Sequence, residues 1–150
     1  MNTFLPYSDF ILSAKVLDKK RCWKQVVEAK QIIDILEKIK TENIHNIPWS
    51  NHPAIKMWIG YSTVLKCYFD EFLWECIHIH GIKTKYKPYH LSGVYDLPWW
   101  FGNEDFHRAM RARLIEKNKE FYLPLFPNDE GFNNGKYFWP DMETKTFKII

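Results

Sequence analysis

Glu28 is a carboxylate on a predicted helix face that is otherwise rich in positive charge. On a helix wheel with about 100° per residue, Arg21, Lys24 and Gln25 fall within about 60° of it. Such a carboxylate can act as a general base or stabilise a positive charge that develops during a reaction, while the cations around it suit a phosphate group. The alternative is a solvated surface with ion pairs, which is the usual role of a charged helix face.

The other residues with chemical potential do not form a recognisable site. His78 and His80 project from different sides of a helix, whereas metal ligands on one helix are three or four residues apart, so we predict no metal site. Cys22, Cys67 and Cys76 have no CxxC spacing and are expected to be reduced, because a buried thiol is more common than a nucleophile with a histidine partner. The GxGxxG, Walker, GxSxG and HExxH motifs are absent, so we predict no cofactor. Glu28 and the amino terminus remain as candidates.

Positive charge is concentrated in two segments, although the net charge of the 150-residue chain is only +3. Residues 15–24 and residues 108–119 each contain five basic side chains and one acidic side chain. Aromatic residues make up 17% of the chain, and Trp99, Trp100 and Phe101 are adjacent. Because cations bind phosphates and flat rings stack on exposed bases, this composition favours a nucleic-acid partner. The alternative, for most of the aromatic residues, is that they fill the core.

The elements that must position these residues are predicted to be helices. Ser8 or Asp9 can cap a short helix that runs to Asp18, and a longer helix follows to about Lys40. The stop signals of this second helix are Thr41-Glu42-Asn43 and the Pro48 region. Its apolar residues fall on one stripe of the wheel, which we expect to face the core: Cys22, Val26, Ala29, Ile33 and Leu36.

The second half of the chain is expected to add two helices and a tail. An apolar central helix begins at Asn51-His52-Pro53 and ends at Gly81, and Asn103 caps a basic helix from Glu104 to about Asn118. Residues 124–150 are expected to form an ordered loop packed by aromatic side chains. The predicted fold is therefore all-α: a compact single-domain helical bundle, residues 1–150, with a long central helix and an ordered aromatic tail.

The chain shows no apolar run of about 20 residues and no basic start followed by an apolar stretch. We therefore expect an intracellular protein that is not secreted and does not contact a membrane.

Several blocks of sequence, in order, resemble the pyrimidine-dimer DNA glycosylase family, which includes the bacteriophage dimer-specific endonuclease V. The blocks are MNTFLPYSDFxxSAKVLDKKRxxKQxxEA, NHPAIKMWxGY, PWWFGxxxFHxxxRxRLIEKNxEFY and GKYFWP. They span residue 2 to about residue 140, and the similarity is clearest to the cellular branch of the family. The resemblance implies a compact helical enzyme that flips a base out of damaged duplex DNA, cleaves the glycosidic bond and nicks the strand at the abasic site.

The resemblance also implies roles for particular residues. The nucleophile is the α-amino group of the mature chain, carried by Met1 or by Asn2, and the essential carboxylate is Glu28. An α-amine has an ordinary pKa of roughly 7.7–8.0, so near neutral pH a useful fraction is the uncharged nucleophile. The phosphate-binding residues correspond to Lys20, Arg21 and Lys24 on the first long helix and to Arg111, Arg113 and Lys117 on the late helix. Lys136 and Tyr137 correspond to the aromatic and basic tail that approaches DNA.

Trp23, Trp99 and Trp100 are candidates for stacking on an extruded base, or for the core. The implied partner is damaged or abasic double-stranded DNA, bound by a monomer without a cofactor. Two alternatives remain open at this point: a non-catalytic nucleic-acid-binding protein on the same scaffold, and a helical protein-interaction module.

Overall fold

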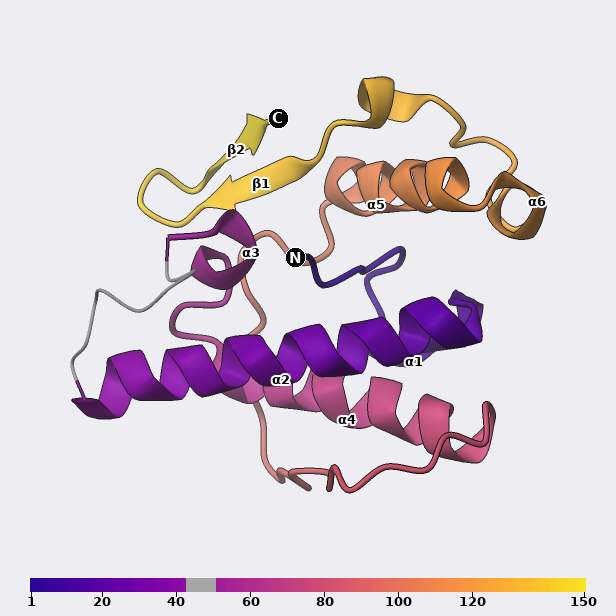
Figure 1. Ribbon diagram of the computed structural model, residues 1–150. Helices are drawn as coiled ribbons and strands as arrows, with labels where there is room; N and C mark the ends of the chain where they lie inside the picture. Colours follow the sequence, from indigo (N-terminus) through magenta and orange to yellow (C-terminus); the bar gives the residue numbers. More distant parts are fainter. Residues whose placement is uncertain (43–50) are drawn as a thin grey trace.

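The computed structural model describes residues 1–42 and 51–150, and within these residues it contains six α-helices, one short 3-10 helix and a two-stranded sheet (Figure 1). The predicted signals Asn43 and Pro48 lie outside the described residues. The elements are α1 (Phe10–Val16), α2 (Lys19–Glu42), α3 (Pro53–Lys56), α4 (Ser62–His78), α5 (Glu104–Lys117), α6 (Lys119–Tyr122), η1 (Phe132–Gly135), β1 (Phe138–Asp141) and β2 (Thr146–Ile149).

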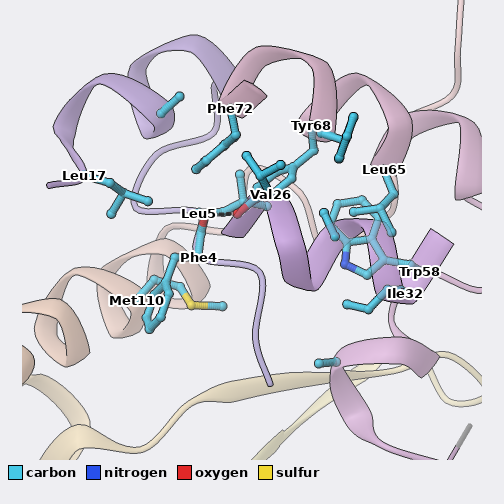
Figure 2. Close-up of a cluster of buried hydrophobic side chains, with 14 of the residues drawn as sticks. Phe4, Leu5, Leu17, Val26, Ile32, Trp58, Leu65, Tyr68, Phe72 and Met110 are labelled. Carbon is cyan, nitrogen blue, oxygen red and sulfur yellow. Dashed lines mark hydrogen bonds between the residues drawn. The ribbon is translucent and has the colours of Figure 1, made fainter. Parts of the chain in front are cut away.

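The amino-terminal segment runs through the middle of the molecule. Figure 1 shows it between the α2 and α4 pair on one side and α5 with β1 on the other. Residues Asn2 to Leu5 are all buried. In Figure 2, Phe4 and Leu5 lie between Met110 of α5 and the apolar side chains of α2 and α4. The first residues of the chain are therefore part of the core and not a free tail.

The cap and stripe predictions for the first two helices are confirmed. Asp9 accepts a hydrogen bond from the backbone N–H of Leu12 and so caps α1. All five residues of the predicted α2 stripe are at most 7% exposed. They pack against α4, where the thiol sulfurs of Cys22 and Cys76 lie 3.3 Å apart. The cysteines are free thiols.

The predicted central helix is two helices. His52 caps the first of them through its Nδ1, but α3 ends at Lys56 and α4 begins only at Ser62. Between them Gly60 has a φ of +83°, a backbone conformation that favours glycine and cannot continue a helix. The break turns Met57 and Trp58 into the core, where both are fully buried.

The predicted all-α class is wrong in one place, because the tail contains a β-hairpin. Strands β1 and β2 pair antiparallel with Trp139 opposite Lys148, and Tyr137 and Ile150 exchange backbone hydrogen bonds beyond the strand ends. Asp141 closes the turn by accepting from the amides of Glu143 and Thr144. The hairpin holds Trp139 in the core and Tyr137 beside the amino-terminal segment.

Within the described residues, no helix combines the length and the apolar character needed to cross a lipid bilayer.

Candidate active site

A pocket of about 340 Å³ opens beside the amino-terminal segment. Its walls come from the first half of α2, the end of α5, the first residues of the chain and Tyr137. It is lined by Met1, Asn2, Phe4, Lys20, Arg21, Lys24, Gln25, Glu28, Arg113, Lys117 and Tyr137. The fold thus brings the two basic segments, far apart in the sequence, to the same opening.

Glu28 lies directly against the backbone of residue 2. Its Oε2 accepts a hydrogen bond from the backbone nitrogen of Asn2 at 2.9 Å, and its side chain is only 13% exposed. The nearest cation is Lys24, whose Nζ is 4.0 Å from Oε1 while its side chain is 62% exposed, so this pair is loose and screened by water. The principal partner of the carboxylate is therefore a main-chain nitrogen near the start of the chain.

Buried polar side chains hold the residues that follow. The indole of Trp58 donates to Thr3 Oγ1 at 3.0 Å. The backbone N–H of Phe4 donates to Gln25 Oε1 at 2.8 Å, and the Tyr68 hydroxyl lies 2.9 Å from the Phe4 carbonyl oxygen. Because an unpaired buried backbone group is costly, these contacts fix the path of the segment.

Helix α5 holds the same segment from the other side. His107 Nε2 accepts from the backbone N–H of Gly102 at 3.0 Å, so its Nδ1 carries the proton and donates to the Leu5 carbonyl at 2.8 Å. Burial lowers the pKa of His107, which favours this neutral form.

The pocket has an excess of positive charge. Five cationic side chains line it together with the single carboxylate of Glu28. The pKa of Lys117 is lowered mainly by partial burial and, to a smaller extent, by the nearby charges of Lys24 and Arg113. The charge of Glu28 raises it. Arg21 is tied to Asp18 at 3.3 Å and Arg113 to Glu116 at 3.0 Å. Such a surface attracts anions, including phosphate groups.

Tyr137 closes one side of the pocket with its ring. The ring lies 6.4 Å from that of Phe4, and the Arg113 guanidinium lies 5.6 Å from its centroid. Burial raises the pKa of Tyr137, against the opposite effects of Asn2 and Arg113, so the side chain remains a neutral phenol. Tyr137 therefore offers an aromatic surface and a hydroxyl next to the cations.

Arg111, for which the resemblance implies phosphate binding, does not line this pocket. It is buried, and its guanidinium donates to Asp129 at 2.8 Å, to Glu104 at 2.6 Å and to the Pro6 carbonyl at 2.8 Å. It lies two residues before Arg113, which is about 200° around the helix, so the two side chains leave α5 on different faces. Arg111 helps to hold the amino-terminal segment instead of facing solvent.

The three candidate stacking tryptophans also lie elsewhere. Trp100 is fully buried and donates to the Met57 carbonyl at 3.1 Å, so it is a core residue. Trp99 packs against Phe147 of the hairpin. Trp23 stacks on Tyr86, with ring centroids 5.8 Å apart. Lys136 is exposed but does not line the pocket.

Gln25 also belongs to the site, although its sequence pattern did not indicate a role there. The sequence placed it on the charged face, yet it is 1% exposed and its amide oxygen binds the amino-terminal segment. On the helix wheel it lies about 20° from the edge of the core stripe, a signal that was ambiguous between the two faces. Its neighbour in space, Phe4, could not be predicted because the contact joins residues 21 positions apart.

The arrangement can support attack by an amine followed by proton transfer. A carboxylate within hydrogen-bond distance of a nitrogen can accept its proton and stabilise a cation formed there. Among residues 1–42 and 51–150, no group of three histidine, cysteine or acidic side chains is placed to hold a metal ion.

The comparisons with known proteins identify a family. The profile of the family described as pyrimidine dimer DNA glycosylase matches residues 1–88, which is more than half of the 150-residue chain. The matched part includes Asn2, Glu28 and the basic residues of α2, whereas α5 and the hairpin lie beyond it. No curated protein and no solved structure matches the chain. The chain belongs to the pyrimidine dimer DNA glycosylase family.

Proposed function

We propose that this protein is a DNA repair glycosylase with abasic-site lyase activity on damaged duplex DNA, where the lesion is a pyrimidine dimer or another damaged base. The observation that carries the proposal is the 2.9 Å contact between the nitrogen of Asn2 and Glu28 Oε2 in a pocket rich in cations. The family supplies the DNA substrate, and the geometry supports an amine and a carboxylate as the reacting pair.

In the proposed reaction, a primary amine attacks C1′ of the damaged nucleotide and the glycosidic bond breaks, releasing the base with its bonding electrons. The nitrogen then gives up one proton, which the departing base takes. The C1′–O4′ bond opens next: O4′ keeps the electron pair of that bond and takes a proton from water, while the nitrogen lone pair forms a protonated imine with C1′. Glu28 stabilises this cation and accepts the C2′ proton, so that the 3′ phosphate leaves by β-elimination. Water hydrolyses the imine and returns the free amine.

The nitrogen of Asn2 is the better placed of the two candidate amines. It is an amide while Met1 precedes it, and removal of Met1 would make it a primary amine 2.9 Å from the carboxylate. Met1 also lines the pocket, so an amine on Met1 is the second possibility. The five cations are proposed to bind the phosphates on either side of the extruded nucleotide.

Borohydride trapping on an abasic-site duplex tests the proposal. A reacting amine gives a covalent protein–DNA adduct because borohydride reduces the imine. Intact mass establishes whether the chain begins at Met1 or Asn2, and peptide mapping is expected to place the adduct on that first residue. An adduct on Lys24 or Lys117 would assign the reaction to a side chain, and the absence of any adduct would favour a non-catalytic DNA-binding protein.

A further inference from the structure

Two side-chain oxygens of α2 bind alternate nitrogens of the amino-terminal segment. Glu28 Oε2 accepts from the nitrogen of Asn2 at 2.9 Å, and Gln25 Oε1 accepts from that of Phe4 at 2.8 Å. The two acceptors are three residues apart and therefore lie on neighbouring turns of one helix face. The segment is thus aligned along α2 at two points, of which only Glu28 has a proposed chemical role.

Gln25 is itself held by its surroundings. Its side chain is in the core, and its Oε1 lies 3.2 Å from the hydroxyl of Tyr68 on α4. The same hydroxyl lies 2.9 Å from the Phe4 carbonyl oxygen. Burial keeps the pKa of Tyr68 well above its usual range, so the hydroxyl keeps its proton and can donate to either oxygen. Both backbone polar groups of residue 4 are therefore fixed by buried side chains from two helices.

We infer that Gln25 is a positioning residue that sets the register of the amino-terminal segment, so that the nitrogen of residue 2 faces Glu28. The inference rests on the proposed function, because it concerns the placement of the proposed nucleophile. A slip of the segment by one residue would move the reacting nitrogen by about 3.8 Å. This displacement is too large to keep the nitrogen at the separation from C1′ at which attack can occur. Gln25 does not touch the reacting atoms and acts through Phe4.

Two substitutions separate this role from ordinary core packing. Gln25→Met keeps the length of the side chain but removes the acceptor, and Gln25→Glu keeps an oxygen that can accept from Phe4. Ile33→Val is the matched control, since it trims a buried residue of the same helix that does not line the pocket. Each variant is tested for the single-turnover rate of borohydride trapping, affinity for an abasic-site duplex, and thermal melting.

We expect Gln25→Met to reduce the trapping rate at least about tenfold, with duplex affinity within about twofold of the parent. Gln25→Glu is expected to recover a large part of the rate, and Ile33→Val to trap at the parental rate after correction for the folded fraction. A Gln25→Met protein that traps at the parental rate would overturn the inference.

Hydrogen exchange gives a second reading that does not depend on catalysis. In Gln25→Met the amide of Phe4 loses its acceptor, and the indole N–H of Trp58, which donates to Thr3 Oγ1 at 3.0 Å, is expected to exchange faster as well because a slip of the segment carries Thr3 away from it. If the Trp58 indole stays protected while Phe4 exchanges, the register does not depend on Gln25. If the parent protein forms no adduct, the proposed function fails, and the exchange of the Trp58 indole still decides whether Gln25 sets the register.

Discussion

At the level of single residues, Glu28 combines a main-chain contact with a cationic surrounding. Its nearest partner is the nitrogen of Asn2, and the lysines and arginines of the pocket lie farther away. A carboxylate used only to balance these cations would be expected to contact them first. This ordering of contacts favours a role toward the nitrogen over a role in a surface ion pair.

Replacing Glu28 by Gln tests that role. The change keeps the size of the side chain and its ability to accept a hydrogen bond but removes the charge, so strand nicking is expected to fall by a factor of the order of 10² or more. Affinity for an abasic-site duplex is expected to survive or increase, because a negative charge near phosphate is lost. Nicking rate and affinity are measured together on one duplex. A variant that nicks at the parental rate would remove Glu28 from the mechanism.

Arg111 and Arg113 show how a difference of two residues changes what an arginine does. Arg111→Met leaves Asp129 with Arg108 as its remaining cation and removes the donor to the Pro6 carbonyl, so we expect a loss of about 3 kcal/mol in the free energy of unfolding. Arg113→Ala is expected to cost about 0–1 kcal/mol, since its ion pair is partly exposed. Urea denaturation of both variants measures the contrast, and equal losses would contradict it.

At the level of elements, the helix boundaries with local signals were predictable. Asp9 and Asn103 cap their helices as expected, because a capping side chain acts on an amide only three residues away. The division of the central helix was not predictable from its apolar residues, since only Gly60 marks the break. The hairpin was missed because its strands have four residues each and Pro140 argues against a strand.

The residues of the candidate site also divide into those that local sequence signals could predict and those that depend on contacts in the folded chain. Glu28 and the cations around it on α2 could be found from the pattern on one helix, whereas the roles of Gln25 and Arg111 depend on contacts with residues 2–6 that form only in the folded chain.

The link between α5 and the amino-terminal segment is expected to depend on pH through His107. His107 Nε2 accepts a hydrogen bond from the backbone N–H of Gly102, so a proton added to Nε2 would point at that N–H group and break the hydrogen bond. Burial already lowers the pKa of His107. The hydrogen bond to the Leu5 carbonyl and the charge of Glu104 raise this pKa, and Arg111 lowers it, but the effect of burial is the largest. The unfolded chain therefore binds a proton at a higher pH than the folded chain. The stability that neutral His107 contributes is fully present above about pH 6.5. It decreases as the pH falls from there toward the lower pKa of His107 in the folded state.

Chemical denaturation at about pH 7.5 and about pH 5 measures this dependence. His107→Asn is the comparison, because its amide can still donate to the Leu5 carbonyl but does not titrate. We expect the variant to be less stable at the higher pH and to lose less on acidification than the parent. The pKa of His52 is also lowered by burial, so part of the parental loss should remain in the variant. An identical loss in both proteins would exclude His107 as a contributor.

At the level of the whole molecule, the distribution of charge matters more than its total. A net charge of +3 would give only weak attraction to DNA if it were spread evenly. The fold instead places five cationic side chains from α2 and α5 around one pocket, with Glu28 as its single carboxylate. The proposed DNA-binding face is therefore defined by the packing of α2, the amino-terminal segment and α5, and no single helix contains it.

This placement predicts a difference between two exposed lysines of the same helix. Lys24 lines the pocket, whereas Lys38 is 14 residues farther along α2, a distance of about 21 Å at 1.5 Å per residue. If Lys24 binds a phosphate, Lys24→Ala should reduce the slope of log affinity against log salt by about 0.9 and weaken binding to all duplex sequences alike. Lys38→Ala should leave the slope unchanged, although both variants lose one positive charge and lower the net charge equally. Titrations of an undamaged duplex at several salt concentrations provide the slopes without any contribution from catalysis. Equal reductions in both variants would show that DNA responds to the overall charge of the protein, and the pocket would then not be its docking site.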